Sequence, residues 1–137
     1  LLGQRALRAA GALTDVAGSS DVFERGFVVY SNEAKHECLG VPHDTIARFG
    51  AVSAETARAM AEGALLRAPA QVSVAVTGIA GPGGGTPTKP VGLVYFAAAR
   101  TGDETLVEER RFGDTGRSGI RAESVETALN LLYRRLA

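Results

Sequence analysis

The chain is poor in several residue types, and each scarcity narrows what it can be. Its 137 residues include one cysteine, Cys38, which excludes an internal disulfide framework. A lone thiol suits a reducing compartment, so we expect a cytoplasmic protein. The two histidines, His36 and His43, have no ligand partner at helical spacing, so we expect no metal.

Excess charge and long apolar runs are also lacking. Fifteen Lys and Arg balance fifteen Asp and Glu, so charge gives no argument for binding nucleic acid or an anionic membrane. No apolar run approaches the roughly 20 residues of a membrane helix, and no secretory signal is visible. The hydrophobic fraction of 45% and the length are those of one soluble globular domain. Because the chain lacks an initiator Met, we expect it to be an excerpt.

Helical and strand patterns alternate along the chain. Apolar spacing and caps predict helices over residues 1–10, 33–39, 44–49, 53–67 and 117–136, with Gly11, Gly40 and Gly50 as stops. Apolar runs predict strands over residues 27–30, 72–76, 91–99 and 105–111, the last two forming a hairpin. We therefore predict a single layered α/β domain over residues 1–137, with a mixed central sheet flanked by helices.

Residues 18–35, GSSDVFERGFVVYSNEAK, surround what we expect to be the central strand, buried on both faces. Behind that strand, Asn32 is the expected N-cap of a helix that contains Lys35. The chain has only two lysines, Lys35 and Lys89, so arginine serves as its general surface cation. A lysine in the first turn of a helix has a lowered pKa, and its amine can then act as a base on a serine.

The same stretch also has a purely structural interpretation. Ser19 and Ser20 would form a turn, Tyr30 would belong to the core, and Lys35 would be solvated. Spacing alone favours this second interpretation.

A glycine-rich loop, TGIAGPGGGTPTKP, covers residues 77–90. It is neither a P-loop nor a dinucleotide fingerprint, because it leads through Pro87 and Pro90 into a strand. Glycines allow close approach of the backbone, and successive N–H groups can bind an anion. Long loops in compact domains are usually functional or disordered, so we favour ligand binding over a simple connection.

Arg117 and Arg121 lie four residues apart at the start of the last predicted helix. Cations there oppose the helix dipole, so they do not stabilise the helix. Recognition of a phosphate or carboxylate would explain them, although a solvated basic face is the default interpretation.

Three stretches of the chain closely resemble the CinA C-terminal domain family. They read GSSDVFERGFVVYSNEAK, FGAVSAETARAMAEGAL and TGIAGPGGGTPTKPVGLVYFA. The resemblance covers most of the chain from Ala12 onward. Stand-alone members of that family are nicotinamide-nucleotide amidases. The resemblance therefore implies hydrolysis of the carboxamide of nicotinamide mononucleotide, which yields nicotinic acid mononucleotide and ammonia without a cofactor.

By the family's pattern, Ser20 is the nucleophile that forms an acyl-enzyme. Lys35 takes the proton of Ser20 and returns it to the departing ammonia, and Tyr30 orients the proton. Gly18 and Ser19 are candidate oxyanion donors. The resemblance assigns the remaining substrate contacts to Asn32, Thr77, Gly78, Gly81, Gly83, Gly84 and Arg117.

Two alternatives stay open: a non-catalytic nucleotide-binding or regulatory module, and an amidase acting on another small amide. In either case we expect a small-molecule nucleotide partner and a homo-oligomer.

The resemblance departs at two places. The family has a strand and a loop reading close to ESCTGG between its first helix and the segment ALTDVAGSS. Here both are absent, and we expect either a shortened member or a segment missing between Gly11 and Ala12. The run from Phe112 to Arg117 also carries an apparent insertion relative to the family's GDR-like run.

Overall fold

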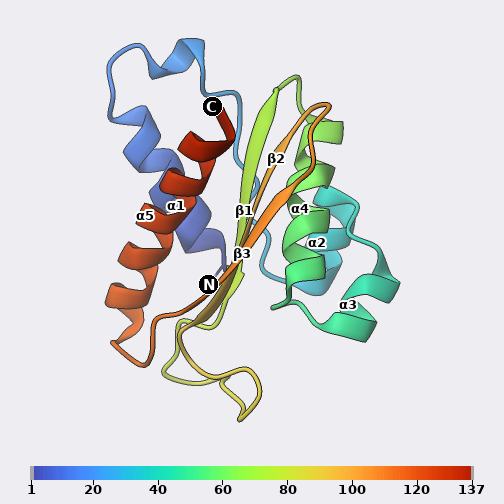
Figure 1. Ribbon diagram of the computed structural model, residues 1–137, viewed down its shortest axis with the longest axis vertical. Helices are drawn as coiled ribbons and strands as arrows, with labels where there is room; N and C mark the ends of the chain where they lie inside the picture. Colours follow the sequence, from blue (N-terminus) through green and yellow to red (C-terminus); the bar gives the residue numbers. More distant parts are fainter. Residues whose placement is uncertain (1, 137) are drawn as a thin grey trace.

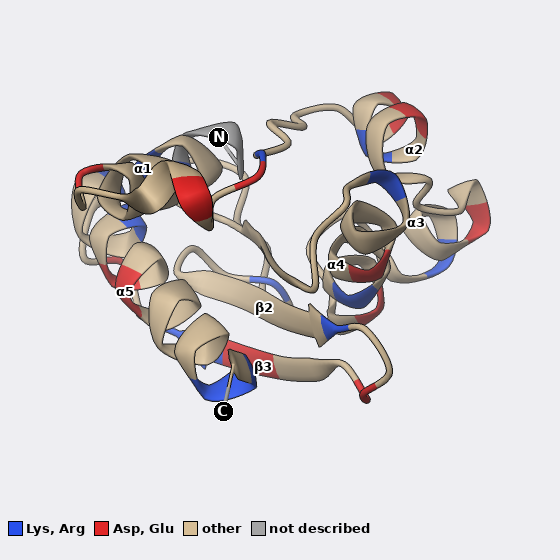
Figure 2. Ribbon diagram, turned by 90° about the horizontal axis from the view of Figure 1, so that it is seen from above, with Lys and Arg blue, Asp and Glu red and all other residues tan. Residues whose placement is uncertain are grey.

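The computed structural model describes residues 2–136. A three-stranded sheet separates two layers of helices, as Figures 1 and 2 show. Helices α1 (Leu2–Thr14) and α5 (Arg117–Leu136) cover one face. Helices α4 (Ala54–Arg67), α2 (Asn32–Leu39) and α3 (His43–Phe49) lie on the other side. The layered α/β class is confirmed.

The sheet has the order β1 (Val72–Gly78), β2 (Leu93–Arg100) and β3 (Leu106–Arg111). Both pairings are antiparallel; Thr77 lies opposite Tyr95, and Ala97 lies opposite Val107. The expected β2–β3 hairpin is confirmed. The expected mixed sheet is not found among the described strands, because β1 as well as β3 pairs antiparallel with β2. The segment 27–30 does not join the sheet.

β2 is the centre of the fold because both of its faces are buried. Ala97 and Ala99 face the core on the α4 side, whereas Val94, Phe96 and Ala98 face the core on the α5 side. The small alanine side chains let both helix layers approach the sheet closely.

Two glycines and a serine set the helix ends where the sequence predicts them. Gly40 and Gly50 close α2 and α3 with positive φ angles of 67° and 84°. The Ser53 hydroxyl accepts from the Thr56 amide at 3.2 Å and caps α4.

Two local predictions are wrong. Gly11 does not end the first helix, since α1 continues without interruption to Thr14. Leu1, the expected start of that helix, lies outside the described residues. The segment 27–30 is not a strand buried on both faces; Val29 is 2% exposed, but Val28 and Tyr30 are half exposed. Without a partner strand this segment gains no ladder hydrogen bonds and buries one face only.

The structure leaves the outer edge of β1 unpaired, since β1 bonds to β2 alone among the described strands. A groove of about 620 Å³ follows this edge. It is lined by Val72–Val76 of β1, by Phe27 and Val29 of the extended segment, and by side chains from both helix layers.

The segment expected between Gly11 and Ala12 is not tested by the continuous helix and stays a prediction.

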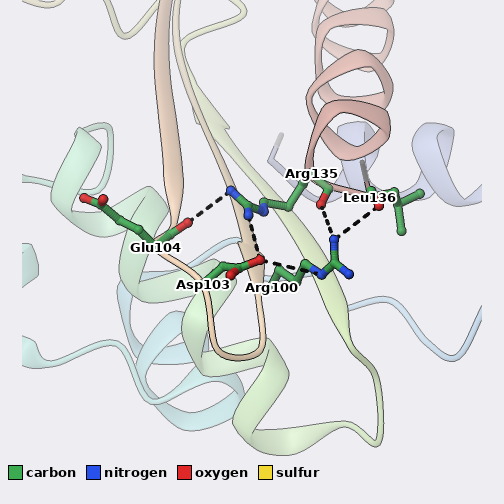
Figure 3. A network of polar contacts seen from close by, with 5 residues as sticks. All are labelled: Arg100, Asp103, Glu104, Arg135 and Leu136. Atoms are coloured by element: carbon green, nitrogen blue, oxygen red, sulfur yellow. Dashed lines mark hydrogen bonds and ion pairs between the residues drawn. The ribbon is translucent and has the colours of Figure 1, made fainter.

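Arginines anchor the end of α5 to the β2–β3 hairpin (Figure 3). The Arg135 guanidinium contacts the Asp103 carboxylate at 2.8 Å and donates to the Glu104 carbonyl at 3.3 Å. Arg100 donates to the carbonyls of Arg135 and Leu136 at 3.3 and 3.2 Å. Both arginines are thus neutralised or hydrogen-bonded by neighbouring elements.

Replacing Phe96 should test whether β2 is the centre of the core. Phe96 is fully buried and meets Phe112 edge to face, with ring centroids 6.4 Å apart. We expect Phe96→Ala to lower the free energy of unfolding by about 3–5 kcal/mol, measured by urea denaturation. Leu66→Ala, at a side chain 84% exposed, is the control and should change it by less than about 0.5 kcal/mol. Equal losses in both variants would contradict the assignment.

Candidate active site

Lys35 is the most unusual titratable group near the expected centre. It is the fourth residue of α2 and only 1% exposed. Its Nζ donates to the Tyr30 carbonyl at 3.1 Å. Burial lowers the pKa of this amine below its usual 10.5, since desolvation disfavours the ammonium. The alternative of a solvated Lys35 is therefore wrong.

The cap of α2 differs from the expectation by one residue. Ser31, not Asn32, caps the helix, and its hydroxyl accepts from the Ala34 amide at 2.9 Å. Asn32 is the first helical residue and is exposed. Tyr30 contacts Lys35 through its main-chain carbonyl, while its side chain is 52% exposed. The expected phenol–amine contact is therefore not among the hydrogen bonds of the described residues.

Ser20 lies in a short 3₁₀ helix, η1 (Ser19–Asp21), which follows Gly18 with its φ of 85°. Ser19 and Ser20 line the groove together with Ala70–Val72 at the start of β1. The chain then runs from Phe23 to Tyr30 without regular secondary structure, and a segment of that length can span at most about 25 Å. Figure 1 shows η1 (blue, at the top) far from α2. One protomer therefore does not bring Ser20 to Lys35.

The glycine-rich loop leaves β1 at the opposite end of the sheet (Figure 1). Gly78 ends β1, and Gly81 and Gly84 have φ angles of 75° and 88°, which favour glycine. Gly83 has no such requirement, and a Cβ there would meet nothing within 4 Å. The Thr77 hydroxyl is fully buried and donates to the Ala51 carbonyl at 2.7 Å.

Arg117, the first residue of α5, reaches this loop. Its Nη1 donates to the Gly81 carbonyl at 2.6 Å, which places Arg117 beside the loop; its contact with a substrate stays a prediction. The second lysine, Lys89, donates to the Phe49 carbonyl at 2.6 Å and fastens the loop to α3. The loop is thus tied to both helix layers.

Arg5 is the residue that our sequence reasoning missed. It is completely buried, and its Nη1 donates to the Gly78 carbonyl at 3.2 Å. A signal was available: Arg5 falls on the apolar stripe of residues 2, 6 and 9, at helical spacing. An arginine in an apolar stripe must be buried or reach a ligand.

The described residues offer few other groups from which a metal site could be built. Among its residues, no group of three or more His, Cys, Asp or Glu could hold a metal ion. His36 and His43 stack with their ring centroids 3.7 Å apart, and His36 Nδ1 lies 2.9 Å from the Val41 carbonyl oxygen. Nor does any described helix have the length and apolar character to cross a membrane.

These features define a class: a three-layer α/β domain that holds a buried amine and a glycine-rich loop contacted by arginines. Comparison with known proteins narrows the class. The chain belongs to the CinA C-terminal domain family, whose model matches residues 8–136.

Named relatives agree with this assignment. A CinA-like protein from Mycolicibacterium vanbaalenii is 52% identical over 127 residues, which are 93% of this chain and 30% of that protein. A CinA-like protein from Akkermansia muciniphila is 59% identical over 99 residues, 72% of this chain and 24% of its own. The chain thus spans less than a third of the length of these curated relatives.

Solved structures share the fold as well. The competence/damage inducible protein CihA from Agrobacterium tumefaciens superposes with a TM-score of 0.93 at 53% identity, over 95% of this chain and 79% of its own. A CinA superfamily protein from Escherichia coli gives a TM-score of 0.88 at 33% identity, over 94% and 74%.

The pH dependence of stability should reveal the buried amine. Because the pKa of Lys35 is lowered on folding, the unfolded chain binds up to one proton more than the native chain between the folded pKa and 10.5. The free energy of unfolding should therefore rise with pH in that window, by about 1.4 kcal/mol per unit at most. We expect urea denaturation to show this rise in the wild type and in Lys89→Met, but not in Lys35→Met. Parallel profiles for all three proteins would disprove it.

Proposed function

We propose that this domain hydrolyses the carboxamide of nicotinamide mononucleotide to nicotinic acid mononucleotide and ammonia. The carrying observation is Lys35, a buried amine with a lowered pKa, in a chain of the CinA C-terminal domain family. A lowered pKa makes the deprotonated amine more accessible, and that form can accept a proton, which arginine cannot do. The glycine-rich loop and Arg117 supply main-chain and cationic groups for the nucleotide.

The proposed reaction has two balanced steps. The Ser20 oxygen attacks the carboxamide carbon while Lys35 takes the hydroxyl proton, and Lys35 then protonates the nitrogen that leaves as ammonia. Water next attacks the acyl ester on Ser20, which releases the acid and restores the serine hydroxyl. Gly18 and Ser19 are proposed to offer main-chain N–H groups to the oxyanion.

Ser20 and Lys35 lie at opposite ends of an extended segment, so this mechanism requires them to come from different protomers. We therefore include a homo-oligomer in the proposal, with Ser20 of one copy facing Lys35 of another. The exposed side chains of Val22, Val28 and Tyr30 along that segment supply apolar surface for such contact. A cytoplasmic location, as the lone exposed Cys38 suggests, is also part of the proposal.

The same separation favours a second candidate, a nucleotide-binding module without turnover. The loop and its arginines would be retained for binding, and Ser20 would be a turn residue. A third possibility, an amidase for another small amide, would keep the reaction and change only the substrate.

Mixing two inactive variants tests the shared site directly. We expect Ser20→Ala and Lys35→Met each to abolish ammonia release from nicotinamide mononucleotide. After joint refolding of equal amounts, about half of the dimers contain one copy of each variant. One of the two sites in such a mixed dimer combines an intact Ser20 with an intact Lys35. About a quarter of wild-type activity should therefore return. An inactive wild-type protein would leave the binding module as the function. An active wild type whose mixture gives no recovery would sink the shared site. A panel of other amides addresses the third possibility.

Two adjacent glycines provide a matched test of the loop. Valine at Gly84 must adopt a φ near 88°, at a strain of about 1–3 kcal/mol, whereas Gly83 has open space and no positive φ. We expect Gly84→Val to weaken binding of nicotinamide mononucleotide by about fivefold or more in calorimetry. Gly83→Val should stay near wild type unless the ligand itself needs that space. An unchanged affinity in Gly84→Val would indicate a purely structural loop.

A further inference from the structure

The free edge of β1 leaves main-chain groups without partners. Thr101 donates to the Gln71 carbonyl at 3.0 Å, so Gln71 directs its main-chain groups toward β2. Alternate residues of an antiparallel strand face opposite sides, so Val72, Val74 and Val76 direct their N–H and C=O groups to the free edge. Within the described residues, none of these three valines has a main-chain hydrogen bond to a residue outside the sheet.

The segment 24–29, which also lines the groove beside β1, has the same deficit. Its main-chain N–H and C=O groups form no hydrogen bond to other described residues. Both the edge of β1 and this segment could therefore pair with one further strand, as edge strands commonly do with a bound peptide.

Side chains from both helix layers make the interior of the groove apolar. From α1 come Ala6, Ala9 and Ala10, whose small side chains leave room beside β1, and from α4 come Met60 and Ala64. A lipid would fill such a space but could not pair with main-chain groups, whereas a strand with apolar side chains does both.

Arg5 gives one end of the groove a positive charge. It lines the groove, is completely buried, and donates to the carbonyl of Gly78, the last residue of β1. Its Nε and Nη2 have no partner among the described residues. None of the eight ion pairs found there includes Arg5. Burial is the largest cause that lowers its pKa to about 10, so Arg5 is still a cation at neutral pH. A carboxylate on the segment that fills the groove would complement this charge.

We propose that the groove beside β1 binds an extended segment of another polypeptide, which adds as a strand to the free edge of β1 and brings an acidic side chain to Arg5. Main-chain hydrogen bonds to Val72, Val74 and Val76 would provide affinity. The apolar lining and Arg5 would select the side chains of the partner. The site requires no turnover of nicotinamide mononucleotide, so it is independent of the proposed function.

Three synthetic peptides with blocked ends test the strand on the wild-type protein. The first reads Glu-Val-Thr-Val-Ala-Val-Glu and matches the seven residues of β1, with a glutamate at each end so that either strand direction brings one to Arg5. The second has proline at its centre, which removes an N–H and interrupts a ladder. The third has glutamine in place of both glutamates. We expect calorimetry to show that the second and third bind at least about tenfold more weakly than the first.

Hydrogen exchange distinguishes an added strand from binding elsewhere. The first peptide should slow amide exchange at Val72, Val74 and Val76, because their N–H groups gain acceptors. The proline peptide, at the same concentration, should give less protection.

Two pairs of proteins locate the peptide. Ala64→Phe places a large side chain in the groove and should abolish binding. Leu66→Phe, at an α4 position that is 84% exposed and does not line the groove, should bind like wild type. Arg5→Met should bind the glutamate and glutamine peptides equally, whereas the wild type prefers glutamate. If Arg5→Met does not fold, the two peptides on the wild type decide the carboxylate contact.

The proposal is overturned if the three peptides bind alike, or if the first peptide leaves the three valine amides unprotected. Wild-type dimers that the first peptide dissociates would identify a second copy as the occupant, and would overturn a separate partner. A fatty acid that displaces the first peptide and binds more tightly than it does would make the groove a lipid site instead. Absence of ammonia release would refute the proposed function alone, because every measurement here is of binding.

Discussion

The pairing of β2 with a strand on each side is the constraint on which the rest of the structure depends. That pairing satisfies the main chain of a strand whose faces are both buried, and it leaves Phe96 and Ala97 pointing into opposite cores. One helix layer packs against each of these cores, with α5 on one side of the sheet and α4 on the other. The two ends of β1 consequently define the two ends of the molecule, with η1 near one and the glycine-rich loop at the other.

The free edge of β1 explains several departures at once. Beside it lie the groove, the extended segment with Phe27 and Val29, and side chains of α1. An unpaired edge and an extended segment without a ladder both lack main-chain partners, and one further strand between them would supply these to both. The family resemblance implies a strand before Ala12, which this chain lacks.

What the sequence could predict follows from how local each signal is. Ser53, Gly40, Gly50 and the β2–β3 hairpin depend on a few neighbouring residues, and each was correctly predicted. The strand over residues 27–30 depended on a partner from elsewhere in the chain, so its apolar pattern alone was misleading. In the candidate site, the position of Lys35 in the first turn of a helix predicted the direction of its pKa shift. The cause in the structure is burial of the amine. The partner atoms of Arg5 depend on the packing of α1 against β1, which no local pattern specifies.

Arginines at the two ends of the molecule illustrate the difference between structural and ligand-directed charge. Arg100 and Arg135 meet carbonyls and Asp103, so their positions are explained by the fold that they stabilise. Arg5 and Arg121 are more deeply buried, and among the described residues Arg5 lacks acceptors for two donors and Arg121 for one, whereas Arg135 lacks one for its Nε alone despite its other contacts. A chain of zero net charge could have placed a carboxylate there as it did elsewhere. Burying such donors without acceptors costs free energy that the hydrogen bonds of Arg100 largely offset at the other end of the molecule.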